Sequence, residues 1–183
     1  NIDTRSRFTR TLTQKAEGGL MAENSIVLGM ADLMVASAPI KLITLGLGSC
    51  IGLVVYDSFA KVAGMAHIML PDSRGLHASE KVGKFADTAV PFLVEEMLKK
   101  GATRPRMKAK IAGGAQMFSL PGASAEFLTV GAKNVSETKK RLARLGIALI
   151  ASDTGGNKGR TIEFSTSNWM LKVKTLGKGV SEI

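Results

Sequence analysis

The chain has one cysteine and two histidines among its 183 residues, and aromatic side chains make up only 5% of it. A single cysteine excludes an internal disulfide framework, and the sequence offers no ligand cluster for a structural zinc ion. No apolar run approaches the roughly 18 residues that a membrane-spanning helix needs. The first residues contain no apolar stretch typical of a secretory signal. We therefore expect a cytoplasmic protein that binds no metal and does not insert into a membrane.

Acidic residues are absent from the segment 99–110, which holds six cations, and the whole chain carries a net charge of +10. A basic face attracts nucleic acid, acidic protein surfaces or anionic membranes. The basic segments match no nucleic-acid-binding module and contain no interleaved aromatic residues. We expect a solvated basic face that suits an acidic protein partner, and no binding of nucleic acid.

Apolar residues, by contrast, are plentiful at 45% of the chain, a fraction typical of packed globular proteins. The length fits one domain. Residues 1–20 are polar and show no periodicity, whereas organised patterns begin after Met21. We expect residues 1–20 to be a flexible or artificially added extension and residues 21–183 to form a single domain.

Apolar and β-branched runs between turn residues indicate strands, and apolar residues at three- and four-residue steps indicate helices. Strands are expected within 25–37, 40–49, 50–57, 61–71, 109–118, 147–153, 160–166 and 169–175, and helices over 80–101 and 134–146. Either Asn134 or Ser136 is expected to cap the second helix. This mixture of strand hairpins and two helices favours an α+β fold, a layered β-sandwich of mixed sheets flanked by helices.

The segment TLGLGSCIGLVVYD (44–57) contains Cys50, and the next expected strand contains His67. If the two strands pair across a two-residue turn, Cys50 lies directly opposite His67. Across a four-residue turn the two residues are diagonal neighbours on the same face. A three-residue turn puts them on opposite faces, because side chains alternate along a strand. The strand pattern alone leaves these alternatives open.

A cysteine beside a histidine is an arrangement for nucleophilic catalysis, since the imidazole lowers the thiol pKa and promotes the reactive thiolate. Gly48 follows Gly46 in a glycine-spaced turn, and the backbone N–H groups near Gly48, Ser49 and Cys50 could bind a developing oxyanion. Thr44 is a candidate for orienting the imidazole.

Two competing interpretations give Cys50 another role. A lone cysteine is usually a small buried hydrophobe, and a histidine among apolar neighbours is usually a core residue. A redox-sensing thiol is a further alternative, but no second cysteine is present to resolve a sulfenate.

TLGLGSCIGLVVYD followed by AGMAHIMLPDS resembles the signature of CheD, the chemoreceptor glutamine deamidase family. IAGGAQMF, VGAKNV and LGIALIASDTGGNKGRTIEF match the family in order and spacing, so the resemblance covers about residues 25–174. It implies a cytoplasmic chemotaxis enzyme that hydrolyses the side-chain amides of selected glutamines on methyl-accepting chemoreceptors, with glutamyl methyl esters as related substrates. It also implies a fold similar to papain-like and toxin-type cysteine hydrolases, and no cofactor.

The resemblance places the catalytic cysteine, histidine and threonine of the family on Cys50, His67 and Thr44. It further implies binding to a CheC-type phosphatase of the response regulator CheY. The loops 113–118 and 153–160, with Gly114, Phe118 and Asp153, are then candidates for the rim of the site, although each of these residues also has a structural interpretation. The alternative function is mainly that of a binding partner of chemoreceptors and a CheC-type phosphatase, with little turnover.

Overall fold

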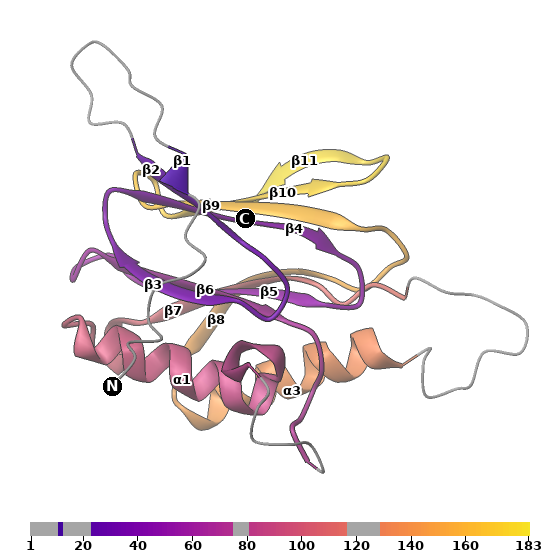
Figure 1. Ribbon diagram of the computed structural model, residues 1–183, viewed down its shortest axis with the longest axis horizontal. Helices are drawn as coiled ribbons and strands as arrows, with labels where there is room; N and C mark the ends of the chain where they lie inside the picture. Colours follow the sequence, from indigo (N-terminus) through magenta and orange to yellow (C-terminus); the bar gives the residue numbers. More distant parts are fainter. Residues whose placement is uncertain (1–10, 13–22, 75–80, 117–128) are drawn as a thin grey trace, which may run out of the picture.

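The computed structural model describes residues 11–12, 23–74, 81–116 and 129–183. They form three layers, namely two stacked β-sheets and a layer of helices (Figure 1). The six-stranded sheet has the order β1 (Thr11–Leu12), β2 (Asn24–Leu28), β4 (Ile40–Leu47), β9 (Arg160–Ser165), β10 (Met170–Thr175) and β11 (Gly179–Glu182). The five-stranded sheet has the order β3 (Leu33–Ser37), β6 (Val62–Ile68), β5 (Ile51–Asp57), β7 (Lys108–Gly113) and β8 (Ala148–Thr154).

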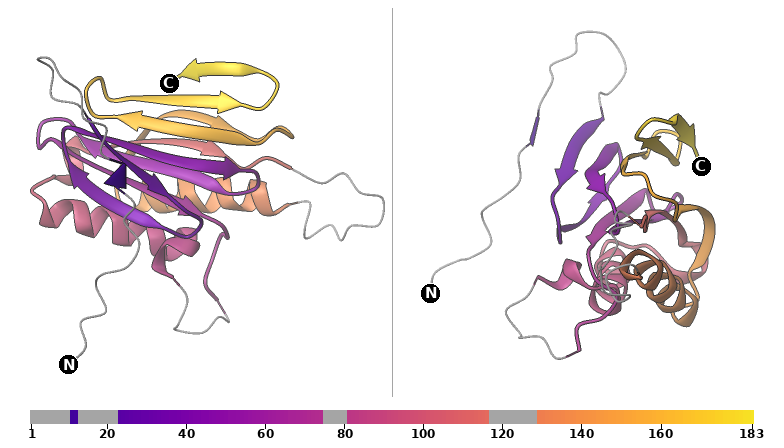
Figure 2. Two further views of the ribbon diagram at one scale, coloured as in Figure 1. Left: turned by 45° about the horizontal axis from the view of Figure 1, so that its top comes forward. Right: turned by 90° about the vertical axis from the view of Figure 1, so that its right-hand side faces the viewer.

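Both sheets are mixed, because β2 pairs in parallel with β4, and β7 in parallel with β8, while their other pairs are antiparallel. The helices α1 (Ala86–Lys99) and α3 (Val130–Arg144) cover the outer face of the five-stranded sheet, as both views in Figure 2 show. Two short 3₁₀ helices, Val82–Lys84 and Arg104–Arg106, flank α1. The α+β sandwich with flanking helices predicted from the sequence is confirmed.

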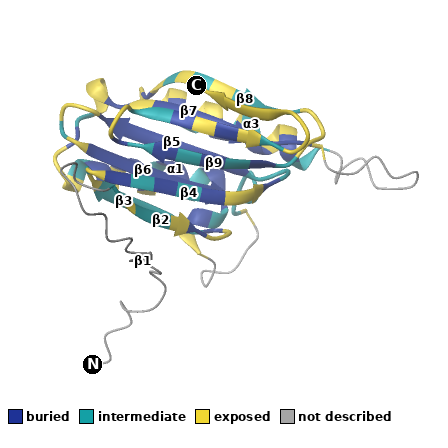
Figure 3. Ribbon diagram, turned by 90° about the horizontal axis from the view of Figure 1, so that it is seen from above, coloured by how far each residue is buried: buried dark blue, intermediate teal, exposed yellow. Residues whose placement is uncertain are grey.

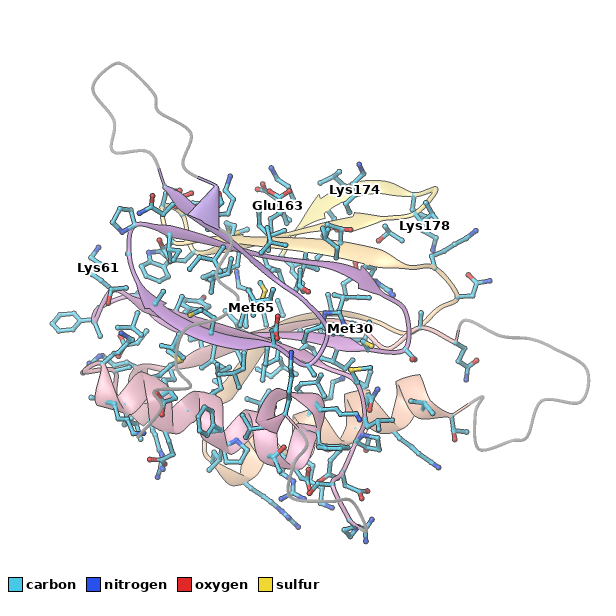
Figure 4. The ribbon with its side chains drawn as sticks, in the orientation of Figure 1. Met30, Lys61, Met65, Glu163, Lys174 and Lys178 are labelled. Atoms are coloured by element: carbon cyan, nitrogen blue, oxygen red, sulfur yellow. The ribbon has the colours of Figure 1, made fainter. Side chains whose placement is uncertain are left out.

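The five-stranded sheet is the central layer, and this explains the continuous apolar runs of β5 and β6. Every residue of these two strands is buried (Figure 3). Leu53 and Val55 of β5 pack towards the helices, whereas Val54 packs into the core between the sheets. Met65 of β6 also lies between the two sheets (Figure 4), while Glu163 lies on the outer side of the six-stranded sheet. Strands with two buried faces carry no polar alternation.

Several boundaries differ from the sequence-based expectation. The first helical segment is broken at Phe85, which has extended dihedral angles, so a 3₁₀ turn precedes α1. The second helix begins at Val130 after Thr129, and Asn134 therefore lies inside the helix rather than at its cap. Strand β11 was not expected. It pairs antiparallel with β10 after a turn that contains Gly177 at a φ of 71°.

Thr11 and Leu12 pair with Ile26 and Ser25 as the short strand β1. The rest of residues 1–20 lies outside the described residues, so the expectation of a flexible or artificially added extension, and of one domain over 21–183, stays a prediction. Within the described ranges, no helix combines the length and apolar character that crossing a membrane requires.

Candidate active site

The β5–β6 hairpin brings the two candidate catalytic residues to one face. Asp57 pairs with Val62 and Gly52 with His67, so the turn between the strands has four residues. Cys50, two positions before Gly52, is then a diagonal neighbour of His67 on the same face. Of the three alternatives left open by the sequence, the four-residue turn is the one that occurs.

The side chain of Asp57 explains the length of this turn. Its carboxylate is fully buried and accepts hydrogen bonds from the backbone N–H groups of Phe59 (3.1 Å) and Ala60 (3.0 Å). The N–H of Thr103 (3.1 Å) and the guanidinium of Arg106 (3.0 Å) also bind it. Burial alone would raise the pKa of Asp57, but these donors hold the pKa below its ordinary value. A turn anchored in this way fixes the face on which His67 lies.

His67 is held by a threonine of the other sheet. Oγ1 of Thr44, on β4, lies 2.8 Å from Nδ1 of His67, and both residues are buried. The same hydroxyl donates to the carbonyl oxygen of Leu28 at 2.9 Å. A hydroxyl has one proton, so Oγ1 must accept from His67, whose imidazole therefore carries its proton on Nδ1.

The opposite nitrogen of the ring is left as a base. Nε2 of His67 is buried and has no hydrogen-bond partner among the described residues. In the Nδ1–H tautomer, Nε2 holds a lone pair and can accept a proton.

Gly52 lets the two sheets approach closely at this point. A Cβ atom at Gly52 would collide with Cδ1 of Ile162 and lie 2.9 Å from Cδ1 of Leu47, both in the opposite sheet. Ile162 is also the register partner of Thr44. Gly52, the residue opposite His67 in the hairpin, thus has no side chain. Side chains of the six-stranded sheet, which also carries Thr44, fill the space beside it.

Burial favours the neutral form of both reactive groups. Burial raises the pKa of the Cys50 thiol, although the backbone N–H of Cys50 opposes this effect. Burial lowers the pKa of His67, and the charge of Asp32 opposes that shift. The lowered thiol pKa expected from the sequence is therefore not found, because the partly buried thiolate loses more hydration than its surroundings replace. A neutral thiol and a neutral imidazole suit proton transfer during attack.

The backbone that precedes β5 is held by its carbonyl groups. The carbonyl of Gly48 accepts from the N–H of Ala115 at 2.8 Å, and that of Cys50 accepts from the N–H of Gly114 at 2.8 Å. Between them, the carbonyl of Ser49 accepts from Nδ2 of Asn134 at 2.9 Å. All three carbonyls of the segment 48–50 are therefore held by hydrogen bonds, two from the loop after β7 and one from α3.

The N–H groups of the same segment are the candidate oxyanion donors. The N–H of Gly48 already donates to the carbonyl of Gly46 at 3.1 Å. Those of Ser49 and Cys50 make no backbone hydrogen bond to the described part of the chain. Of the predicted donors, Ser49 and Cys50 are therefore better placed than Gly48.

Comparisons with known proteins show the family to which the chain belongs. The family model for CheD, described as CheD chemotactic sensory transduction, matches residues 69–175, which is more than half of the chain. A protein of Clostridium novyi named "Probable chemoreceptor glutamine deamidase CheD" is 50% identical over 163 residues, which cover 89% of this chain and 100% of that protein. This chain belongs to the CheD family.

Other CheD proteins are similarly close. A protein of the same name from Caldanaerobacter subterraneus is also 50% identical over 89% of this chain and 100% of its own length, and one from Clostridium kluyveri is 43% identical over the same shares. Among solved structures, the Neisseria meningitidis protein NMB0706 is similar at a TM-score of 0.42, with 10% identity over 68% of this chain and 53% of that one.

The predicted rim residues of this CheD chain have structural contacts. Gly114 has a φ of 66°, and a Cβ atom there would collide with Val135 of α3. Asp153 accepts hydrogen bonds from Nε (3.1 Å) and Nη2 (2.8 Å) of Arg160. Phe118 lies outside the described residues. A role of these three residues in binding a partner stays a prediction.

A cavity of about 590 Å³ does adjoin the rim candidates. Its lining comes from α3 and from the two loops that follow β7 and β8, and includes Gly114, Val135, Lys139 and Gly155. Asp153 is not among its lining residues, but lines a smaller cavity of about 150 Å³ with Arg160.

Two residues of the site were missed in the sequence. Asp57 was treated only as the last residue of a strand, although an aspartate at the first position of a turn commonly binds backbone N–H groups two and three residues later. Asn134 was considered only as a helix cap, yet it is fully buried and contacts the cysteine segment. A single asparagine in a helix gives no signal from which such a contact could be deduced.

Proposed function

We propose that this chain is a chemoreceptor glutamine deamidase, which hydrolyses the side-chain amides of selected glutamines on methyl-accepting chemoreceptors to glutamate and ammonia. The observation that carries the proposal is the state of His67. Its Nδ1 is held by Thr44 across the two sheets, and its Nε2 is buried without a partner on the face shared with Cys50. The names of the CheD relatives supply the substrate class.

The first step begins from the neutral pair. Nε2 of His67 takes the proton of the Cys50 thiol while Sγ attacks Cδ of the substrate glutamine. A C–S bond forms, and the π electrons of the carbonyl move onto its oxygen. The N–H groups of Cys50 and Ser49 stabilise the resulting oxyanion.

The second step releases ammonia. The imidazolium of His67 gives its Nε2 proton to the departing amine, the C–N bond breaks, and a thioester to Cys50 remains. Water then attacks the thioester carbonyl as Nε2 takes one of its protons, and the proton returns to the sulfur when glutamate leaves. Amide and water are consumed, and carboxylic acid and ammonia are produced, without a metal or an organic cofactor.

Thr44 orients the imidazole throughout this cycle. Its hydroxyl is committed as a donor to Leu28, so it can only accept from Nδ1–H. This keeps the Nε2 lone pair in place and stabilises the imidazolium that forms in both steps, as the third member of other triads does.

The proposal includes two partners and a compartment. Chemoreceptors are the substrate, and a CheC-type phosphatase is a further partner that would approach the same end of the sandwich, where Gly114 and Asp153 lie. The reaction takes place in the cytoplasm, where the signalling helices of the receptors are accessible.

The test is mass spectrometry of a receptor cytoplasmic fragment incubated with the protein. Conversion of glutamine through a thioester to glutamate adds about one dalton per site. We expect this change, with release of one ammonia per site, for the wild type and not for Cys50→Ala. Receptor conversion by Cys50→Ala at the wild-type rate would refute the mechanism. Tight receptor binding without conversion by the wild type would favour a mainly regulatory partner.

A further inference from the structure

The side chain of Asn134 joins the two strands of the catalytic hairpin beyond the end of their ladder. Its Nδ2 donates to the carbonyl of Ser49 and to that of Met69, each at 2.9 Å. Both acceptors are carbonyl oxygens, so the atom between them must be the amide nitrogen. The regular pairing of β5 with β6 ends at Ile51 and Ile68. Asn134 therefore connects the residue before Cys50 to a residue two positions after His67.

This contact fixes the direction of the Cys50 N–H. The carbonyl of Ser49 and the N–H of Cys50 belong to one planar trans peptide group and point in opposite directions. Because Asn134 draws the Ser49 carbonyl towards α3, the Cys50 N–H is directed away from α3. That N–H makes no backbone hydrogen bond with the described residues.

Three hydrogen bonds hold the carbonyls of the segment 48–50, and of these three only the one from Asn134 comes from a side chain. The neighbouring carbonyls of Gly48 and Cys50 are bound by backbone N–H groups, which almost any residue at 115 and 114 can supply. The Ser49 carbonyl depends on the amide of Asn134. The helix that carries it is also seated directly on the loop, because a Cβ atom at Gly131 would lie 2.6 Å from the carbonyl oxygen of Gly114.

The surroundings of Oδ1, the other polar atom of the Asn134 side chain, indicate that its role is not purely structural. Oδ1 of Asn134 is buried and has no hydrogen-bond partner among the described residues. An unpaired buried acceptor lowers stability, and an apolar side chain of similar size would avoid that cost. The two hydrogen bonds that Nδ2 donates are therefore the reason for an asparagine at this position.

We propose that Asn134 is a positioning residue for oxyanion binding, which sets the Ser49–Cys50 peptide so that the Cys50 N–H faces the substrate carbonyl oxygen. The inference rests on the proposed amide hydrolysis at Cys50. Asn134 itself touches neither the substrate nor the sulfur in this role. It acts through the backbone, on the charge that develops in the transition state.

The experiment compares Asn134→Leu with the wild type. Leucine keeps the branch at Cγ and removes both hydrogen bonds. We expect kcat for ammonia release from the receptor fragment to fall at least about tenfold with little change in KM, since a misplaced oxyanion donor affects the transition state more than the bound substrate. Binding of a peptide aldehyde, which forms a tetrahedral adduct with the cysteine, should weaken by a similar factor.

Alkylation of Cys50 by iodoacetamide separates this role from a general disturbance of the site. Alkylation at a saturated carbon produces no oxyanion, so its rate should stay within about threefold of the wild type. Thr138→Val is the matched control. Thr138 lies one turn further along α3, is fully buried, and has no partner for its hydroxyl among the described residues. This variant should retain the wild-type kcat and aldehyde affinity.

Each outcome has a distinct meaning. Wild-type kcat in Asn134→Leu overturns the inference, and so does a loss of alkylation parallel to the loss of kcat. Absence of receptor conversion by the wild type refutes the proposed function instead. If Asn134→Leu does not fold, the wild type bound to the peptide aldehyde decides the matter: the adduct oxygen is expected about 3 Å from the Cys50 nitrogen. An adduct oxygen directed away from that nitrogen overturns the inference.

Discussion

His67 and Thr44 are joined by a hydrogen bond of 2.8 Å although they belong to different sheets of the sandwich. Thr44 donates its own proton to Leu28, a residue of its own sheet. The candidate base is therefore positioned by a chain of two hydrogen bonds that begins in one sheet and ends in the other.

Replacing Thr44 by valine should reduce turnover with little effect on substrate binding. Valine has the same shape but leaves Nδ1–H of His67 and the carbonyl of Leu28 unpaired. We expect kcat to fall by about tenfold or more with KM nearly unchanged, because the tautomer and direction of the imidazole are no longer fixed. Steady-state ammonia release measures both values.

Thr166→Val is the matched control for this change. Thr166 is also buried, and its Oγ1 exchanges hydrogen bonds with the backbone N–H (2.8 Å) and carbonyl (3.0 Å) of Ile40, away from the site. It should lower the free energy of unfolding and leave kcat unchanged. A wild-type kcat in Thr44→Val would contradict the role of Thr44.

The reactivity of Cys50 should rise only at alkaline pH in the substrate-free protein. Burial raises the thiol pKa above its ordinary value, so little thiolate exists at neutral pH. Because Cys50 is the only cysteine, the rate of iodoacetamide labelling as a function of pH reports on it alone. The midpoint should lie above that of the same chain unfolded in urea. Rapid labelling that is constant down to pH 6 would instead indicate a preformed thiolate–imidazolium pair.

Stability should decrease as the pH falls below the pKa of an unfolded histidine, about 6.5. Burial lowers the pKa of His67 in the folded state, so the unfolded state binds a proton first. The stability associated with neutral His67 is present above about pH 6.5 and is lost as the pH falls towards the folded-state pKa.

The measurement is urea unfolding at pH 7 and pH 5, for the wild type and for His67→Asn. The Asn side chain can still donate to Thr44 Oγ1 but does not titrate, so this variant should lose less stability between the two pH values. An equal loss in both proteins would contradict the linkage.

Gly52→Ala should disturb the site through the packing of the two sheets. The added methyl group collides with Cδ1 of Ile162 and approaches Cδ1 of Leu47. We expect a loss of about 1–3 kcal/mol in the free energy of unfolding, typical of overpacked cores. Activity should fall as well, because separation of the sheets lengthens the Thr44–His67 contact.

A suitable comparison is Gly159→Ala, since a Cβ atom at Gly159 meets no other atom within 4 Å. That variant should retain both stability and activity. Unchanged activity in Gly52→Ala would mean that the sheets adjust without moving Thr44.

The sequence could predict the layers of the fold and the types of residue in the candidate site. It could not predict the long-range contacts that hold these residues in place. Continuous apolar runs in β5 and β6 indicate a central sheet, because neither face of such strands can meet water. The face shared by Cys50 and His67 depended on turn length, and turn length depends on the buried carboxylate of Asp57. The local sequence pattern limits the turn to a few lengths but does not show which length occurs.

Long-range contacts were beyond the reach of periodicity. Asn134 is separated from Ser49 by 85 positions, and nothing in its local pattern distinguishes a buried amide from a solvated one. The pKa of Cys50 illustrates the same limit. The neighbouring histidine was expected to lower it, but the degree of burial, which depends on both sheets, decides the direction.

The division of the base and its support between two sheets also affects when the molecule can react. A swollen molecule with native-like strands but loosened packing would keep Cys50 and lose the fixed imidazole, because the hydroxyl of Thr44 would no longer reach the ring. Newly synthesised or damaged copies of the protein would accordingly not hydrolyse glutamine side chains on the surfaces of other proteins. Chemical competence would thus require the native packing of the two sheets against each other.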